Sequence, residues 1–195
     1  MTIYHPKLAE ILRRDPRYAY EAYEFVFAAL AHTQHQLGRV PAEGQDEPGP
    51  HHHVSGAELL PWSWAVERLE AARNYWLCTT RSTGRPHAAP VWGVWLDGAV
   101  WFSTSPSSQK GRNLARQRWV VIHLESGDET VILEGQVEEV HDRDARVRFA
   151  DAYEAKYAYR PDPDDEGGAV YVLRPRLAQT WRESDYTRSA TRWIF

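Results

Sequence analysis

The chain has 195 residues, of which 43% are hydrophobic and 26% are charged, and its formal net charge is −4. This length allows one domain with a sizeable core plus a small annex, and the slightly acidic balance argues against a nucleic-acid-binding protein, which usually carries a basic face. A single cysteine, Cys78, excludes an intrachain disulfide and fits a reducing compartment. No apolar run reaches the roughly 18 residues of a membrane-spanning helix, and Met1–Leu12 lacks the features of a secretion signal. We therefore expect a cytoplasmic protein that binds neither nucleic acid nor membrane.

The first third of the chain divides into a helical annex, residues 1–39, and a linker, residues 40–60. Apolar and aromatic residues recur with a 3.6-residue period between residues 4 and 37, which predicts helices over about 6–13 and 16–37. The linker is rich in Pro, Gly and acidic residues. It contains a triple histidine, His51–His53, but a linker does not fix metal-binding geometry, so we predict no metal site.

Strand-like segments separated by turn signals begin after residue 61. We expect a helix over Ser63–Arg73, then two helices that interrupt the strands, Gln109–Arg116 and Asp142–Tyr159. The predicted strands are Tyr75–Arg81, His87–Leu96, Ala99–Thr104, Val120–Glu125, Thr130–Val140, Ala169–Glu183 and a last one ending at Phe195. Six or seven strands in mostly hairpin order predict a mainly β protein, a closed antiparallel barrel over residues 61–195 with a few added helices.

One segment has the composition of an anion site. Five hydroxyl residues (Ser103, Thr104, Ser105, Ser107 and Ser108) follow Phe102 at the end of a predicted strand, and Gln109, Lys110, Arg112 and Asn113 of a predicted helix come next. Hydroxyls and backbone N–H groups at a helix start favour an anion, and Lys110 adds a point charge. The alternative is an ordinary serine-rich turn that caps a helix.

The order of these pieces resembles the pyridoxamine-5′-phosphate-oxidase-like superfamily, the flavin- and deazaflavin-binding split β-barrels. Four pieces carry the resemblance over residues 61–195: the hairpin TTRSTGRPHAAPVWGVWLDGAVWFST, its Asp97-Gly98 turn, the segment FSTSPSSQKGRNLARQRWVVIHLE, and the closing Thr191–Trp193 with Phe195. The resemblance implies a six-stranded antiparallel split barrel of the FMN-binding type. It also implies a homodimer with the cofactor between the subunits.

Site residues follow from that resemblance. It places Thr104, Ser108 and Lys110 at the cofactor phosphate and the cofactor ring along the second strand, where small residues let a ligand approach the main chain. Arg192 and Trp193 become candidates to reach the cofactor of the other subunit. The full set of expected cofactor-binding residues is His87, Ala88, Ala89, Pro90, Val91, Trp92, Ser103, Thr104, Ser105, Ser108, Gln109, Lys110, Asn113, Arg192 and Trp193.

The chain departs from true pyridoxamine phosphate oxidases at three places. The second strand lacks their Arg and Lys, Gln109 stands where a basic residue usually precedes the motif lysine, and the C-terminal Arg-x-His is missing from Ser189–Phe195. Vitamin B6 oxidation is therefore not expected. The pattern implies an oxidoreductase that uses FMN, or alternatively a deazaflavin coenzyme, to pass hydride to or from a small conjugated substrate; no catalytic residue stands out. A flavin- or haem-binding protein without turnover and a structural dimer with an empty site remain alternatives.

The N-terminal 60 residues have a resemblance of their own. The stretches DPRYAYEAYEFVFAALAHTQHQLG and HVSGAELL are similar to the front half of a small bacterial family of unknown function. In that family a further helical portion follows, whereas here Pro61 leads directly into the predicted barrel. We expect the annex to pack on the barrel or on the dimer.

Overall fold

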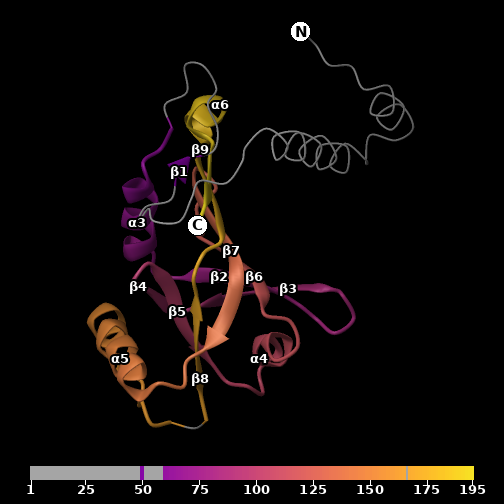
Figure 1. The fold of residues 1–195 in the computed structure, drawn as a ribbon, viewed down its shortest axis with the longest axis vertical. Helices are drawn as coiled ribbons and strands as arrows, with labels where there is room; N and C mark the ends of the chain where they lie inside the picture. The colour runs from indigo at the N-terminus through magenta and orange to yellow at the C-terminus, as the bar shows by residue number, and fades with distance from the viewer. Residues whose placement is uncertain (1–48, 51–58, 166) are drawn as a thin grey trace. The chain divides into compact units, whose positions relative to one another are not determined.

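The computed structural model describes residues 49–50, 59–165 and 167–195 (Figure 1), all within one compact unit, Gln45–Phe195. The predicted helices over 6–13 and 16–37 and the triple histidine lie outside the described residues. The described helices are α3 (Trp62–Ala71), α4 (Gln109–Leu114), α5 (Arg143–Tyr157), the 3-10 turn η2 (Glu183–Asp185) and α6 (Tyr186–Ser189). The strands are β1 (Gly49–Pro50), β2 (Tyr75–Thr80), β3 (Pro86–Val91), β4 (Gly93–Leu96), β5 (Ala99–Thr104), β6 (Trp119–His123), β7 (Glu129–Glu139), β8 (Ala169–Leu173), β9 (Leu177–Arg182) and β10 (Thr191–Ile194).

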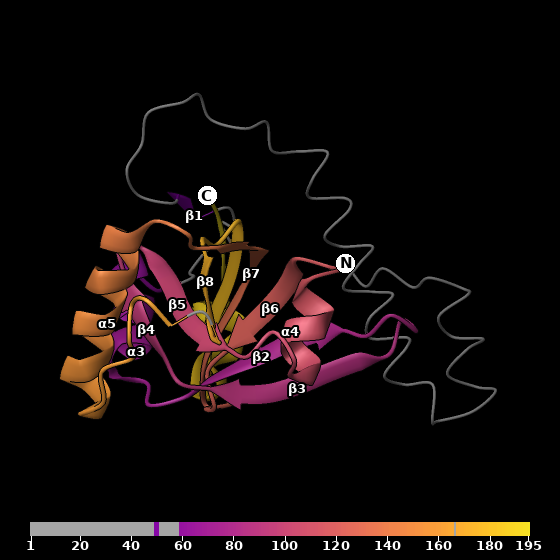
Figure 2. The same cartoon turned by 90° about the horizontal axis from the view of Figure 1, so that it is seen from below.

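The strands form an antiparallel half-barrel, which confirms the predicted fold class (Figures 1 and 2). One part runs in the order β1-β10-β9-β7-β6-β2-β3, and a second part joins β4, β5 and β8. The 11-residue strand β7 links the two, because it pairs with β6 and β9 along most of its length and with β8 at Val137–Glu139. None of the described helices is long and apolar enough to cross a membrane.

Two predicted strands are each broken in two, and the two-residue β1 lies in the predicted linker, so the described residues contain ten strands rather than six or seven. His87–Leu96 breaks at Trp92, where the chain leaves β2 as its partner and takes β5 instead. A side chain at Gly93 would place its Cβ 2.7 Å from the carbonyl oxygen of Trp101, so only glycine fits the break. Ala169–Glu183 breaks around Pro175, which has no N–H to continue a ladder.

Other predicted boundaries agree within a few residues. The strand Ala99–Thr104 is confirmed without change. Asp142 caps α5, since its side chain accepts a hydrogen bond from the Ala145 N–H at 2.8 Å. The predicted turn Asp97-Gly98 has positive φ at both residues, 52° and 70°, as a two-residue hairpin turn requires.

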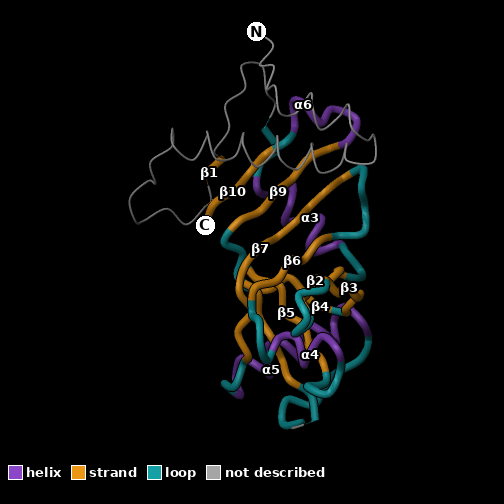
Figure 3. Tube along the Cα trace, turned by 90° about the vertical axis from the view of Figure 1, so that its right-hand side faces the viewer, coloured by secondary structure: helices purple, strands orange, loops and turns teal. Residues whose placement is uncertain are grey.

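Two apolar clusters hold the layers together. The larger fills the half-barrel with inward side chains such as Leu77, Phe102, Ile122 and Leu133, closed on one side by α3. The smaller lies between α5 and the other face of β4, β5 and β8, around Trp101 and Phe149. Leu114 at the end of α4 joins the larger cluster, whereas Gln109 and Lys110 near its start are partly exposed; Figure 3 shows α4 below β2 in that view.

Candidate functional site

The predicted anion site forms a compact set of hydroxyls between β5 and α4. Thr104 ends β5, and its Oγ1 lies 3.0 Å from Oγ of Ser108. The Ser108 oxygen also accepts a hydrogen bond from the Gly111 N–H at 3.0 Å and so caps α4. Two hydroxyls from sequence positions four apart therefore share one place at the start of the helix.

The loop between them is closed by its own hydrogen bonds. The Ser108 N–H donates to the Ser105 carbonyl at 3.0 Å, and the Ser105 and Ser107 hydroxyls lie 2.8 Å apart. Arg112 donates to the Ser107 carbonyl and, at 3.1 Å, to Oε1 of Gln109. The Arg112 guanidinium thus stabilises the loop and is not a free charge.

Lys110 is the cation that the loop leaves available. It is partly exposed, and it makes no hydrogen bond or ion pair with any residue that the structure describes. A lysine without a carboxylate partner, two residues after the Ser108 cap, is a candidate to bind an external anion. We call Thr104, Ser108 and Lys110 the hydroxyl–lysine seat.

Asn113 connects α4, which carries Lys110 of the seat, to the neighbouring strand β2. It is 2% exposed, its Nδ2 donates to Oγ1 of Thr79 at 2.8 Å, and its Oδ1 accepts from Nε2 of Gln109 at 2.8 Å. Thr79 in turn donates to the His87 carbonyl at 3.3 Å. The network links α4 through β2 to β3, so the structure gives Asn113 and Gln109 a positioning role beside the predicted cofactor contact.

Sequence reasoning missed Thr79. The signal was present, because Tyr75, Leu77 and Thr79 alternate on the inward face of β2 and a threonine that ends an apolar alternation needs a hydrogen-bond partner. That partner comes from a helix 34 residues later, a separation that no local pattern reports.

Removal of the Asn113 amide should lower the free energy of unfolding measurably. Asn113→Ala leaves the buried Thr79 hydroxyl and the Gln109 amide without their partner, which costs about 1–3 kcal/mol. Urea unfolding followed by tryptophan fluorescence measures the loss. Gln117→Ala, an exposed residue just past α4, is the control, and equal stabilities of the two variants would contradict the network.

Strand β3 distributes its predicted site residues over two faces. His87, Ala89 and Val91 lie on the inward face, on the side of Thr79 and α4, whereas Ala88 and Pro90 are exposed on the outward face. The next residue, Trp92, is 42% exposed and stacks on Tyr157 of α5 at 4.7 Å between ring centroids, with the ring planes 2° apart. Trp92 therefore belongs to the α5 side.

Two polar side chains of α5, Lys156 and Tyr157, hold Gly93 at the start of β4, just after the end of β3. The Tyr157 hydroxyl accepts from the Gly93 N–H at 2.9 Å and lies 2.7 Å from the Gly93 carbonyl. Lys156 donates to the same carbonyl at 3.0 Å and to the Tyr75 hydroxyl at 3.3 Å. Burial lowers the pKa of Lys156 to about 8, and no carboxylate among the described residues is paired with it.

The depressed pKa of Lys156 gives stability a defined pH dependence. Between pH 8 and 10.5, the ordinary value for lysine, the unfolded chain holds the proton that the folded chain has lost, so the free energy of unfolding rises with pH. Measurements stop near pH 10, because the tyrosines beside it, Tyr75 and Tyr157, have pKa values raised by burial and act in the opposite direction. Lys156→Met should abolish the rise from pH 8 to 10 in urea unfolding; an unchanged slope would contradict this role.

The two C-terminal candidates for cofactor contact do not lie beside the other predicted site residues. Arg192 and Trp193 are on β10, which is separated from β3 by β9, β7, β6 and β2, so one chain does not bring them to the hydroxyl–lysine seat. Trp193 points inward, is 3% exposed, and donates to Oγ1 of Thr180 at 3.1 Å. Arg192 points outward and makes no hydrogen bond or ion pair within the described residues. Only Arg192 retains a surface for contact with another subunit.

Side chains of the kinds that ligate metal ions are scattered over the described residues. Within the described ranges no group of three or more His, Cys, Asp or Glu side chains is placed to hold a metal ion. Cys78 is a free, half-buried residue of β2 whose pKa is raised by burial. The chemistry that the site offers is anion binding by hydroxyls and an ammonium group beside a strand of small residues.

Comparison with known structures supports the fold. A conserved hypothetical protein of Mycobacterium tuberculosis is similar at 23% identity and a TM-score of 0.58, over 67% of this chain and 89% of that chain. A nimc/nima family protein of Clostridium acetobutylicum is similar at 14% identity and a TM-score of 0.56, over 68% and 91% of the two chains. A haem-binding protein of Mycobacterium smegmatis shares 26% identity at a TM-score of 0.51, over 63% of this chain and 55% of that chain.

The sequence comparisons agree with this result. No curated protein matches the sequence significantly. The family model for pyridoxamine 5′-phosphate oxidase matches residues 65–182, which include the hydroxyl–lysine seat, β3 and α5. The match covers more than half of the 195 residues, and the chain therefore belongs to the pyridoxamine 5′-phosphate oxidase family of split barrels.

Proposed function

We propose that this protein is an oxidoreductase that binds a flavin-type cofactor and passes hydride to or from a small conjugated substrate. The observation that carries the proposal is the hydroxyl–lysine seat. Lys110 has no partner among the described residues, and it follows Ser108 by two residues at the start of α4, where the Thr104 and Ser108 hydroxyls lie 3.0 Å apart. One hydroxyl of this pair donates to the other, so a phosphate oxygen can accept from the remaining hydroxyl and from the Lys110 ammonium, and an ammonium–phosphate contact is a strong, charge-assisted one.

The ring of the cofactor fits along β3. Within the described residues β3 pairs only with β2, so backbone N–H and C=O groups along its other edge are available to a ligand. Ala88 and Ala89 are small enough to let a planar ring approach the main chain. When bound, the flavin supplies the capacity for hydride transfer, and the protein positions the ring and excludes water.

Two features of the chain set it apart from a vitamin B6 oxidase. Residues Ala88–Trp92 carry no cation, and Gln109 contributes an amide that is already bonded to Asn113 and Arg112. The phosphate is therefore held by one lysine and hydroxyls. This smaller set suits a cofactor phosphate better than a second phosphate on the substrate.

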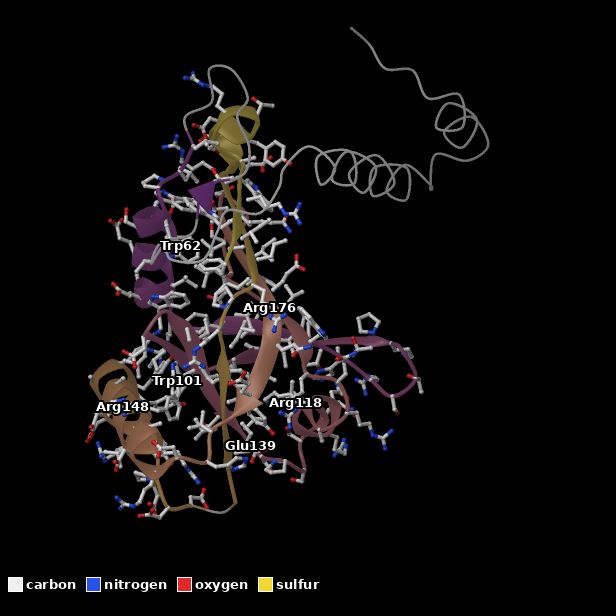
Figure 4. All side chains as sticks on the ribbon, viewed as in Figure 1. Trp62, Trp101, Arg118, Glu139, Arg148 and Arg176 are labelled. Carbon is white, nitrogen blue, oxygen red and sulfur yellow. The ribbon has the colours of Figure 1, made fainter. Side chains whose placement is uncertain are left out.

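FMN is the preferred cofactor over a deazaflavin coenzyme. The deazaflavin has a longer acidic tail, which needs further cations near the seat. Arg112 is committed to Ser107 and Gln109, which leaves Arg116 and Arg118 beyond the end of α4; Figure 4 shows Arg118 in this position. These two exposed arginines are few cations to bind the acidic tail of the deazaflavin coenzyme.

Titration with flavin, followed by fluorescence, tests the proposal. We expect the purified protein, titrated with FMN, to quench flavin fluorescence with saturation at one FMN per chain, and Lys110→Gln to weaken that binding. Saturable uptake of a deazaflavin with no uptake of FMN would make the alternative coenzyme correct. If neither ligand binds, the proposal is wrong.

A second candidate is a protein that binds a flavin or haem without turnover. The similarity to the haem-binding protein of Mycobacterium smegmatis, at 26% identity, favours it specifically. Titration with haemin distinguishes the two: a saturable Soret shift together with no hydride transfer from reduced nicotinamides to bound FMN would favour the binding protein. Hydride transfer by the FMN complex would favour the enzyme.

A further inference from the structure

The two lysines among the described residues lie in different surroundings. Lys110 is the cation of the hydroxyl–lysine seat, whereas Lys156 lies in the last turn of α5, one residue before Tyr157. Helix α5 packs on β4 (Figure 2), so Lys156 reaches the junction between β3 and β4. The proposed function gives Lys156 no chemical role.

Aromatic rings flank the Lys156 amine. Its Nζ lies 4.8 Å from the ring centroid of Tyr75 and 5.5 Å from that of Tyr157. The Tyr75 side chain is fully buried, and the exposed Trp92 stacks on Tyr157 with the two ring planes 2° apart. Two rings therefore lie beside the amine, and a third packs against the second of them.

The polar partners that the structure gives this amine are uncharged. Nζ donates to the Gly93 carbonyl at 3.0 Å and to the Tyr75 hydroxyl at 3.3 Å, and the Tyr75 hydroxyl itself donates to the Leu69 carbonyl. Lys156 forms no ion pair with a carboxylate of the described part of the chain. No negative charge in contact with the amine therefore stabilises its ammonium form.

Burial without a counter-charge favours the uncharged amine. It lowers the pKa of Lys156 from the ordinary 10.5 to about 8. At pH 7.5 about one Lys156 amine in four is then uncharged, against about one in a thousand for an ordinary lysine. The other ionisable groups here are Tyr75 and Tyr157, whose pKa values burial raises, with Glu70 near the first phenol and Arg73 near the second.

We propose that Lys156 is a carbonyl-binding residue, whose amine condenses reversibly with a small aromatic aldehyde to form an imine. The nitrogen attacks the carbonyl carbon, a C=N double bond forms, and the carbonyl oxygen leaves as water with the two amine hydrogens. Lysines in desolvated, apolar surroundings are the ones that form such imines. When the imine takes up a proton, its N–H can donate to the Gly93 carbonyl, which the amine already uses.

The rings beside the amine select an aromatic aldehyde. The substituent of an aldehyde bound to Nζ lies within reach of the Tyr157 ring, and an aromatic ring gains from contact with another aromatic ring beyond the area that it buries. An aliphatic aldehyde of similar reactivity lacks this gain. The amine therefore supplies the covalent bond, and Tyr157 supplies the preference for an aromatic substituent.

This carbonyl site does not depend on the proposed cofactor. The network of Asn113 and Thr79 joins α4 to β3 at His87, whereas Lys156 binds Gly93 beyond the opposite end of β3. Imine formation needs neither the hydroxyl–lysine seat nor a flavin. Labelling of the chain without added flavin therefore tests this proposal separately from the proposed function.

Reductive trapping of the imine on the full chain is the decisive experiment. Benzaldehyde is added with sodium cyanoborohydride at pH 7.5, which reduces an imine to a stable secondary amine, and the labelled lysines are identified by peptide mass spectrometry. Lys110 is also partly exposed and serves as the reference within the same molecule. We expect Lys156 to be labelled at least about tenfold faster than Lys110. Equal rates at the two lysines would overturn the proposal.

A second aldehyde and one variant separate the parts of the proposal. With acetaldehyde, which has no ring, we expect a smaller ratio of Lys156 to Lys110 labelling; an equal ratio would overturn the preference for aromatic aldehydes. Lys156→Arg keeps donors for Gly93 and Tyr75 but cannot form an imine, so rapid labelling should disappear while the melting temperature stays close to that of the parent chain. Rapid uptake of benzaldehyde by this variant would show that another amine reacts. The peptide map of the parent chain decides the question even if the variant fails to fold.

Discussion

Replacement of Lys110 by glutamine should weaken FMN binding by about 2–3 kcal/mol, the value of a charge-assisted hydrogen bond that is lost, which corresponds to about 30- to 150-fold in Kd. The effect is large because Lys110 is the sole cation of the hydroxyl–lysine seat with no other partner among the described residues. Its removal leaves the phosphate with hydroxyl donors alone. Stability should change little, since Lys110 makes no contact that the fold requires.

The matched control is Arg112→Gln, two residues further along the same helix. Its guanidinium is bonded to the Ser107 carbonyl and to Gln109, so we expect a loss of stability in the loop with a smaller loss of affinity. Fluorescence titration and thermal melting of both variants separate the two effects. If Lys110→Gln bound FMN as tightly as the parent chain, the assignment of the phosphate site would be wrong.

Local sequence patterns were sufficient to predict the helices, strands and turns, but not the places where a predicted strand breaks in two. The turn at Asp97-Gly98, the strand Ala99–Thr104 and the cap at Asp142 each depend on a few neighbouring residues, and all three are confirmed. The break at Trp92 depends on Trp101, which lies on the neighbouring strand β5 and whose carbonyl leaves no room for a side chain at Gly93. A pattern read along one strand contains no information about a carbonyl on the next strand.

The same limit applies to the candidate site. The two hydroxyls Thr104 and Ser108 lie four residues apart in sequence, so a local pattern was enough to predict that they come together, and their role with Lys110 as a phosphate site stays a prediction. The role of Thr79 comes from a partner 34 residues away. The difference between Arg192 and Trp193 comes from the alternation of β10, which turns one residue outward and the other into the core.

The substitution Gly111→Ala should destabilise the protein even though alanine favours a helix. Helix propensity alone predicts a gain of about 1 kcal/mol from this change. Against that gain, a Cβ at residue 111 would overlap the carbonyl oxygen of Ser105 and stand 2.9 Å from both Cα and O of Pro106. These are backbone atoms that cannot rotate away, so the loop must shift, and forced overpacking costs about 1–3 kcal/mol or more.

The clash falls on the loop that carries the seat, so two measurements should change together. We expect the melting temperature of Gly111→Ala to fall by about 3–10 °C, and FMN affinity to fall because Ser108 moves with the loop. Gly127→Ala is the matched control: no atom lies within 4 Å of its added Cβ, so its melting temperature and affinity should match the parent chain. If Gly111→Ala were as stable as that control, helix propensity would outweigh the close approach of the loop, and α4 would not be held against residues 105 and 106 as the structure has it.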